Sequence, residues 1–360
     1  MNTLCLDSIA LLRRMIRIPS ESFHEEEVSE MIYDTLQGWG LAPERYGNNI
    51  VAVGKGFDSS RKTLVLDAHI DTVAPSEGYT RDPYDPGDDE NIVYGLGSND
   101  DGGSVVAMIA VFRHFHNKSL PFNLVLSLNC EEERSGPGGA CLLYGPDGPT
   151  EVKDADWVII GEPTGMKAAT SERGLLVLDG LAEGVSGHAA RNEGVNALYL
   201  AMEDIQALRS HIFGKVSPLM GDVSLNVTQI NAGTAHNVIP DRCSFVVDIR
   251  PTEQYSNEEI LNELQSICRS RLTPRNLKNR SSATFTGSPL LKTTSRLGIE
   301  TFSSPTTSNW MRTGKDAIKM GPGDSSRSHK ADEYILCREI EQSVEKYITF
   351  IENFYGDTLE

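Results

Sequence analysis

The most constraining feature of this sequence is a glycine-rich stretch, residues 94–103, that carries two adjacent carboxylates, Asp100 and Asp101. It leads directly into the apolar run 104–112, whose length is typical of a buried helix. The two aspartates are therefore expected on a tight turn at a helix N-terminus, where glycine lets the backbone come close to a bound ion. Aspartate also commonly caps helices, so this stretch alone leaves a structural and a functional interpretation open.

Length, composition and charge limit what the chain can be. With 360 residues it exceeds one comfortable core, so two domains are the default expectation. The net charge of −18 disfavours nucleic acid and anionic membranes as partners, because both are negatively charged. The six cysteines are scattered without a Cys-x-x-Cys pair, and the N-terminus predicts an amphipathic helix instead of a signal peptide. No stretch is long enough to span a membrane, and we expect a cytoplasmic protein with reduced thiols.

Strands and helices alternate along most of the chain, which predicts an α/β fold with a largely parallel or mixed sheet. In the middle of the chain the order becomes strand, helix, strand, strand, helix, closed by a strand at residues 282–285, which is the ferredoxin-like split arrangement. The C-terminal part returns to the first pattern. We therefore expect a larger α/β domain, residues 1–173 and 286–360, with a small α+β domain inserted at residues 174–285. The polar stretch 273–282 is expected to be a mobile loop.

Acidic residues and histidines follow the segments expected to be strands. His69 and Asp71 are two apart on extended backbone, so Asp71 can orient the imidazole of His69. A histidine satisfied at a strand end is the ordinary explanation for such a pair. Three glutamates, residues 131–133, follow the strand expected at 123–129. Such a run is either a solvated loop or a cation site with one glutamate as ligand and a neighbour as general base.

Two more candidates follow strands further along the chain. Glu162 comes just after the apolar strand 157–160, and His329 follows the strand expected at 317–320. In open α/β folds ligands bind at the carboxyl ends of the strands, so we expect these side chains to converge on one place. Oxygen and nitrogen donors without cysteine suit zinc, cobalt or manganese. Together the strand ends predict a metal site.

Taken jointly, these motifs resemble the acetylornithine deacetylase and succinyl-diaminopimelate desuccinylase family of di-zinc metallopeptidases, over essentially the whole chain. The resemblance is closest to bacterial acetylornithine deacetylase-like enzymes. The segment from His69, His-Ile-Asp-Thr-Val, matches the family's first motif, and Tyr-Gly-Leu-Gly-Ser-Asn-Asp, which ends at Asp100, matches its second. The resemblance implies a mixed-sheet, di-zinc exopeptidase-like catalytic domain with an inserted lid and dimerisation domain.

The same resemblance implies a site with two Zn²⁺ per subunit, for which Co²⁺ could substitute. Asp100 would bridge the metals, Asp71 would orient His69, and Glu132 would be the general base. The metal ligands that it implies are His69 and Glu162 for one ion and Glu133 and His329 for the other, with Asp100 shared.

Two departures from the family pattern make these assignments decisions of register. Where the family commonly has Asp-Met-Lys-Gly, residues 100–103 are Asp-Asp-Gly-Gly. We take Asp100 as the bridging residue because it keeps the spacing from the preceding glycines. Aligning Glu131 with the aspartate of the family's Asp-Glu-Glu makes Glu132 the base and Glu133 the ligand.

The inserted domain carries three further candidates. His188, in Gly-Val-Ser-Gly-His, resembles a family histidine that reaches into the site, often from a partner subunit, so a homodimer is implied. By analogy it would donate a hydrogen bond to the developing oxyanion. Asn237 and Arg250 match positions that grip the substrate, and a guanidinium fork suits an α-carboxylate. The ordinary explanation for Arg250 is a surface ion pair.

The resemblance favours metal-dependent removal of the Nα-acyl group from a small-molecule Nα-acyl amino acid. Nα-acetylornithine ranks first and Nα-acetylcitrulline or an Nα-succinyl analogue next, which implies arginine biosynthesis. A dipeptidase or other exopeptidase on the same scaffold is the enzymatic alternative. A catalytically inactive binding protein is the alternative from another class, and absence of bound metal would favour it.

Overall fold

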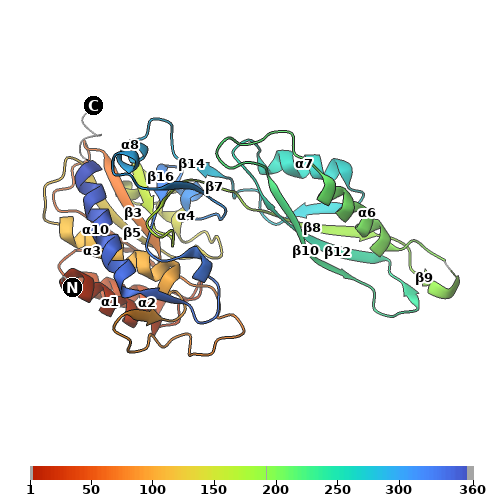
Figure 1. Cartoon of the computed structure of the whole chain (residues 1–360), viewed down its shortest axis with the longest axis horizontal. Helices are drawn as coiled ribbons and strands as arrows, with labels where there is room; N and C mark the ends of the chain where they lie inside the picture. The colour runs from red at the N-terminus through yellow and green to blue at the C-terminus, as the bar shows by residue number, and fades with distance from the viewer. Residues whose placement is uncertain (1–2, 192, 355–360) are drawn as a thin grey trace. The chain divides into compact units, whose positions relative to one another are not determined.

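The computed structural model describes residues 3–191 and 193–354. The chain divides into two compact units (Figure 1). The larger unit consists of Met1–Thr170, Thr284–Phe302 and Ser308–Glu360, and the smaller unit of Ser171–Ala283 and Ser303–Thr307. The middle of the chain thus forms a unit of its own, while the two end parts together build the other.

A mixed β-sheet forms the centre of the larger unit, which confirms the expected α/β fold class. Its described strands follow the order β1-β2-β5-β3-β6-β16-β7-β14, with β15 beside β7. The four central strands β5, β3, β6 and β16 run parallel, and the pairs on either side of them are antiparallel. The bounds are Glu44–Tyr46 (β1), Asn49–Val53 (β2), Thr63–His69 (β3), Asn123–Asn129 (β5), Trp157–Ile160 (β6), Ala168–Glu172 (β7), Ser282–Ala283 (β14), Thr301–Ser304 (β15) and Asp316–Lys319 (β16).

The central strands are apolar on both faces because each face packs against a separate core. All seven residues of β3 are buried, which is typical of a parallel strand covered on both sides. Leu64 and Leu66 belong to the main core, whereas Val65 belongs to a second cluster that also contains Val158 and Trp310. Successive side chains of a strand point to opposite faces, and the two clusters follow that alternation.

Helices α1, α2, α3 and α10 contribute many of the apolar side chains of the main core. In α1 they recur at helical spacing from Cys5 to Ile16. No helix in the described ranges is long and apolar enough to cross a membrane. The bounds of the helices described in this unit are Thr3–Ile16 (α1), Glu26–Gly38 (α2), Gly103–Phe115 (α3), Ala140–Leu143 (α4), Thr150–Lys153 (α5), Pro289–Arg296 (α8), Trp310–Thr313 (α9) and Cys337–Phe354 (α10). Outside the main sheet, the strand Ile92–Tyr94 (β4) pairs with Tyr334–Leu336 (β17).

The described residues of the smaller unit include a four-stranded antiparallel sheet and the helices α6 and α7. Along the chain its elements are β8, α6, β10, β12, α7 and β13, and its strand order is β10-β12-β8-β13, the split arrangement expected from the sequence. Alternate residues of β8 are buried, so one face of this sheet packs against the helices. The bounds are Leu176–Glu183 (β8), Ala197–Ser210 (α6), Ser224–Ala232 (β10), Arg242–Arg250 (β12), Asn257–Ile267 (α7) and Arg271–Pro274 (β13).

The strand that closes this sheet is β13, so the expectation of a closing strand at residues 282–285 was wrong. β13 pairs with β8 and includes the beginning of the stretch that we expected to be a mobile loop. Ser282 and Ala283 pair with β7 instead. Phe285, at the end of the range expected to be the closing strand, is 58% exposed, whereas Leu272 in β13 is buried.

Candidate metal centre and active site

The four parallel strands of the larger unit end at the same edge of the sheet. In the register of the sheet His69 lies opposite Asn129, the last residue of β5, and Ile160 lies opposite Lys319, the last residue of β16. The loops that leave these strands carry residues 131–133, Glu162 and His329. The predicted site residues therefore follow strands that end at one edge of the sheet.

The carboxylate of Asp100 lies between two imidazoles. Its Oδ1 is 3.3 Å from Nε2 of His69, and its Oδ2 is 3.6 Å from Nε2 of His329. Glu133 Oε1 lies 2.9 Å from the same nitrogen of His329. One oxygen of Asp100 thus faces each histidine, so the carboxylate offers one donor atom to each side.

Among the residues that the structure describes, two groups of donor atoms fit a cation site. His69, Glu132 and Glu133 form one group, and Asp100, Glu133 and His329 form the other, with ligand atoms within 4.8 Å of one another in each. Glu162 belongs to neither group, but the charges of Asp100 and Glu132 act on its carboxylate. Burial raises the pKa of Glu162 well above its ordinary value, the buried Lys319 opposes that rise, and the charges of Asp100 and Glu132 add to it. Such crowding of oxygen donors suits divalent cations.

Asp71 fixes the orientation of His69. The backbone oxygen of Asp71 is 3.0 Å from Nδ1 of His69, and its carboxylate Oδ1 is 3.4 Å from the same nitrogen. Because Nδ1 faces these oxygens, Nε2 points into the site as a candidate ligand atom. Burial alone would raise the pKa of Asp71, but its contacts with His69 and Ser22 outweigh burial and hold that pKa below its ordinary value.

The geometry separates the neighbouring carboxylates in both questions of register. Asp100 faces the histidines, whereas the side chain of Asp101 is buried against Gly161, where a Cβ atom would come within 2.8 Å of Asp101 Oδ2. Among residues 131–133, the carboxylate of Glu131 accepts a hydrogen bond of 2.7 Å from the N–H of Gly138. The other two glutamates lie in the donor groups described above. The geometry thus favours Asp100 as the bridge, with residues 132 and 133 divided between base and ligand.

Glu132 has the electrostatic character of a general base. Burial raises its pKa to about 8, and repulsion from Glu133 and Asp71 adds to this rise. His69 and Arg312 oppose the rise. A carboxylate whose pKa lies near neutrality can both accept and return a proton at physiological pH.

In the smaller unit, a two-stranded ribbon brings His188 and Asn237 together. Gly187–His188 (β9) pairs with Val238–Ile239 (β11), and Ala189 N–H donates to the backbone oxygen of Asn237 at 3.0 Å. His188 is exposed, and its Nδ1 accepts a hydrogen bond of 3.1 Å from Ala190 N–H. The Nε2 atom of His188 is therefore the ring nitrogen that can act as a donor.

Arg250 forms an ion pair, which is the alternative to substrate binding that the sequence left open. Its Nε and Nη2 donate to the two carboxylate oxygens of Asp248 at 2.8 and 3.0 Å. Asp248 lies two residues earlier on β12, so both side chains project from the same face of the strand. The substrate contacts expected of Arg250 and Asn237 stay predictions, as does the oxyanion contact expected of His188.

Comparison with known proteins identifies the family. The model of Peptidase family M20/M25/M40 matches residues 65–353. The chain belongs to this family. It is 25% identical over 394 aligned residues to a succinyl-diaminopimelate desuccinylase of Delftia acidovorans, covering 98% of this chain and 97% of the relative. It is 27% identical over 385 aligned residues to an acetylornithine deacetylase of Proteus mirabilis, covering 96% of each chain.

The fold is also that of a solved tripeptidase from Staphylococcus aureus, with a TM-score of 0.76, 17% identity and coverage of 98% of this chain and 99% of that one. The resemblance inferred from the motifs is thereby confirmed. The chain is a metal-dependent hydrolase of amide bonds, and the donor groups at the strand ends fit the metal ions that this family requires.

The sequence did not single out Glu333, which holds the turn that carries Asp100. Its buried carboxylate accepts hydrogen bonds from the N–H groups of Gly97, Asn99 and Asp100 at 3.2, 2.8 and 2.9 Å. Burial raises the pKa of Glu333 to about 7, the charge of Asp100 adds to that rise, and the three N–H donors oppose it. Glu333 is an ordinary acid before an apolar strand in the sequence, and no spacing relates it to residues more than 200 positions earlier.

Proposed function

We propose that this enzyme removes the Nα-acyl group from an amino acid, with Nα-acetylornithine as the first substrate to test. Nα-acetylcitrulline and Nα-succinylornithine are its closest variants. The observation that carries the proposal is the carboxylate of Asp100 between two imidazoles, with Glu132 beside them. Relatives named for a deacetylase and a desuccinylase, aligned over nearly the whole chain, support acyl amino acids as the substrate class.

The metal ions assigned to the site are two Zn²⁺ per subunit, with Co²⁺ as a substitute. His69 and Glu162 would hold one ion and Glu133 and His329 the other, with Asp100 shared between them. When bound, these ions supply Lewis-acid activation of a water molecule and of the acyl carbonyl. The buried Asp71 keeps the imidazole of His69 turned toward them.

Glu132 moves the protons in this reaction. Its carboxylate takes a proton from the attacking water and returns it to the leaving amine. The raised pKa of Glu132, about 8, suits both steps because the group can exist in either protonation state near neutral pH. The products are the free amino acid and the carboxylate of the acyl group.

Residues of the smaller unit bind the substrate in this proposal. Ala190 N–H donates to Nδ1 of His188, so Nε2 of that ring can donate to the oxyanion. The pair with Asp248 fixes the guanidinium plane of Arg250 and occupies Nε and Nη2, so Nη1 is the group assigned to the substrate α-carboxylate. Asn237 lies beside His188 on the ribbon and contacts the same substrate.

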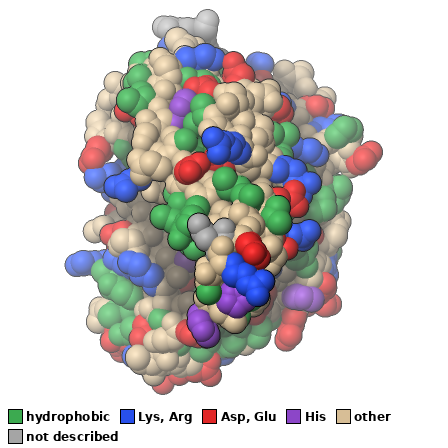
Figure 2. All heavy atoms as spheres, turned by 90° about the vertical axis from the view of Figure 1, so that its right-hand side faces the viewer, with side chains coloured by type: hydrophobic (Ala, Val, Ile, Leu, Met, Phe, Trp, Pro, Cys, Tyr) green, Lys and Arg blue, Asp and Glu red, His purple; other side chains and the backbone are tan. Residues whose placement is uncertain are grey.

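We also propose that the protein is a homodimer joined through its smaller units. Strand β10 is an edge of its sheet, and its Ile230 is 50% exposed. On the neighbouring helix α6, Tyr199 is 64% and Met202 is 55% exposed. Figure 2 shows hydrophobic side chains interspersed with charged and histidine side chains. Edge strands with exposed apolar side chains pair readily with a second copy. Sedimentation of the wild type as a monomer that retains full activity would contradict this.

The test of the reaction is amine release from a small panel, in the presence of Zn²⁺ or Co²⁺ and with a chelator control. The panel holds Nα-acetylornithine, Nα-acetylcitrulline, Nα-succinylornithine and two dipeptides. Chelator-sensitive turnover of one acyl amino acid is the expected result and places the enzyme in arginine-type biosynthesis. Turnover of the dipeptides alone would replace the deacylase by a peptidase.

We also propose a cytoplasmic enzyme, which its six free cysteines support.

A further inference from the structure

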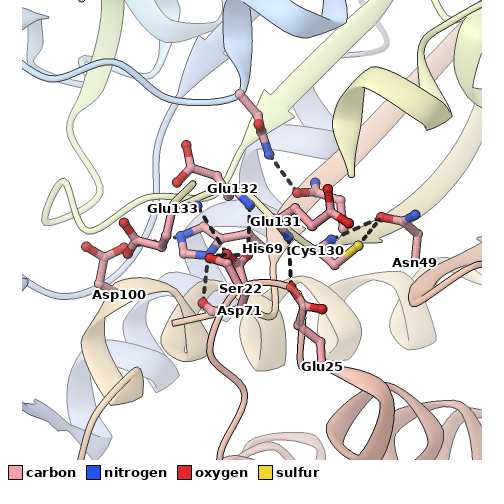
Figure 3. Close-up of polar contacts among 12 residues, drawn as sticks. Ser22, Glu25, Asn49, His69, Asp71, Asp100, Cys130, Glu131, Glu132 and Glu133 are labelled. Carbon is pink, nitrogen blue, oxygen red and sulfur yellow. Dashed lines mark hydrogen bonds and ion pairs between the residues drawn. The ribbon is translucent and has the colours of Figure 1, made fainter. Parts of the chain in front are cut away.

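Side-chain oxygens hold four successive backbone N–H groups in the turn after β5 (Figure 3). Along residues 130–133 these groups donate in order to Asn49 Oδ1 at 3.0 Å, Glu25 Oε1 at 3.1 Å, and Asp71 Oδ1 and Oδ2 at 3.0 and 3.1 Å. The turn begins after Asn129, which is the last residue of β5 in the register with β3. Its conformation therefore depends on these side chains and not on the sheet ladder.

Glu25, one of the three acceptors, is a fully buried carboxylate, which proteins seldom contain without partners. Its Oε1 also accepts a hydrogen bond of 2.8 Å from Phe23 N–H, and its Oε2 accepts one of 3.2 Å from the amide of Asn48. Glu25 directly precedes α2, so the positive end of that helix also favours its charge. These donors offset part of the cost of burying the carboxylate at this place.

The turn that Glu25 and Asn49 hold has a demanding backbone conformation. Glu131 has φ of 58°, in the left-handed region that residues other than glycine seldom adopt. Asn49 also spans the turn, because its amide donates to the backbone oxygen of Gly138 at 2.6 Å while its oxygen accepts from Cys130 N–H. A turn in this conformation needs external partners to persist.

We propose that Glu25 and Asn49 are positioning residues that set the carboxylates of Glu132 and Glu133 at the metal centre. The inference rests on the proposed function, in which Glu132 is the general base and Glu133 a metal ligand. Asp71 connects the two parts, because the same carboxylate that faces His69 also accepts the last two N–H groups of the turn. The base and one ligand are thus placed relative to His69 by a single buried network.

Three substitutions of Glu25 distinguish the effect of where its acceptor oxygen lies from the effect of its charge. Glu25→Gln keeps the length of the side chain and a carbonyl acceptor, and we expect its kcat within about threefold of wild type. Glu25→Asp keeps the charge but withdraws the acceptor by one methylene, and Glu25→Ala removes the acceptor. For both we expect kcat on Nα-acetylornithine to fall about 10- to 100-fold with little change in KM, because a displacement of about 1 Å can cost that much.

Cation affinity gives a readout independent of turnover. Because Glu133 belongs to the same turn, we expect Glu25→Asp and Glu25→Ala to bind Co²⁺ about 10- to 100-fold more weakly in chelator competition, with Glu25→Gln close to wild type. The matched control is Asp204→Ala in the smaller unit. Asp204 is a buried carboxylate that likewise accepts two consecutive N–H groups, of Arg269 and Ser270 at 3.0 and 2.7 Å, and its loss should reduce stability without changing kcat or Co²⁺ affinity.

The proposal is overturned if Glu25→Asp and Glu25→Ala lose only stability while kcat and Co²⁺ affinity stay at wild-type values. It is also overturned if Glu25→Gln loses as much kcat and Co²⁺ affinity as Glu25→Ala, since the charge of Glu25 and not the position of its acceptor oxygen would then matter. If Glu25→Ala does not fold, Glu25→Asp decides between these results. A wild type that binds Co²⁺ but hydrolyses no member of the panel refutes the proposed function, whereas the order of Co²⁺ affinities still tests the positioning role.

Discussion

The buried carboxylate of Asp67 should make the stability of the larger unit depend on pH. Asp67 lies on β3 and accepts hydrogen bonds from Asn129 Nδ2 at 2.8 Å and from the Tyr144 hydroxyl at 2.9 Å. Burial raises its pKa to about 6 from an ordinary value of 3.8, although hydrogen bonds from Ser127, Tyr144 and Asn129 oppose that rise. The folded chain therefore keeps a proton on Asp67 at pH values where the unfolded chain has lost it.

The sign and size of the effect follow from that difference in pKa. Since the folded-state pKa is the higher one, the unfolding free energy declines as pH rises from about 4 through about 6. One pKa unit corresponds to about 1.4 kcal/mol, so the decline due to Asp67 is on the order of 3 kcal/mol. Asp67→Asn cannot titrate. The stability of wild type relative to this variant should therefore fall by on the order of 3 kcal/mol between pH 4 and pH 8.

Urea unfolding of the metal-free proteins, followed by tryptophan fluorescence, measures this difference. Trp39, Trp157 and Trp310 are the three tryptophans of the chain, and all belong to the larger unit, so the signal reports the unit that contains Asp67. Asp34→Asn on the exposed side of α2 controls for the loss of one surface charge. A stability difference between wild type and Asp67→Asn that stays constant from pH 4 to pH 8 would refute the raised pKa.

Three further predictions concern the site and its metal ions. Glu333→Ala should lower the unfolding free energy by roughly 3 kcal/mol or more, because three N–H groups lose a buried acceptor worth about 1–3 kcal/mol each. Glu333→Gln, which keeps an acceptor oxygen, should lose less. Urea unfolding measures both variants, and equal losses would contradict the role of the Glu333 oxygens. His188→Ala should reduce kcat about 10²- to 10³-fold without changing metal content, and an unchanged kcat would remove it from the mechanism. Zn²⁺ at about 100 times its Kd should stabilise the metal-free protein by about 2.7 kcal/mol, and a melting temperature insensitive to Zn²⁺ would argue against the site.

The central sheet could be predicted because its strands are continuous apolar runs. β5 and β6 have the bounds that the sequence predicts, and every residue of β5 is buried. The sequence did not reveal β7, where apolar and polar residues are mixed, or the closing strand β13, where polar residues surround Leu272. In both strands the pairing partner, and not the local pattern, determines the extended conformation.

The candidate site divides in the same way. Histidines and acids that follow strands could be located, because the carboxyl ends of parallel strands necessarily meet at one edge of the sheet. Glu25, Asn49 and Glu333 could not be found, since the bonds by which they hold the site's turns join residues 81 to 236 positions apart and are made to backbone N–H groups. A sequence does not show which backbone N–H group a distant side chain will bind. Side chains that act through them become visible only in the folded chain.

The most direct test of the proposed mechanism compares wild type with Glu132→Gln on Nα-acetylornithine, with bound metal determined in the same samples. Glutamine has the shape of glutamate but cannot accept the proton of the attacking water. We expect both proteins to bind two divalent cations per chain, and the variant to release ornithine about 10²- to 10⁴-fold more slowly than wild type. Turnover by the variant at the wild-type rate, or turnover by wild type stripped of metal, would contradict the assignment of a metal-dependent hydrolase with Glu132 as its base.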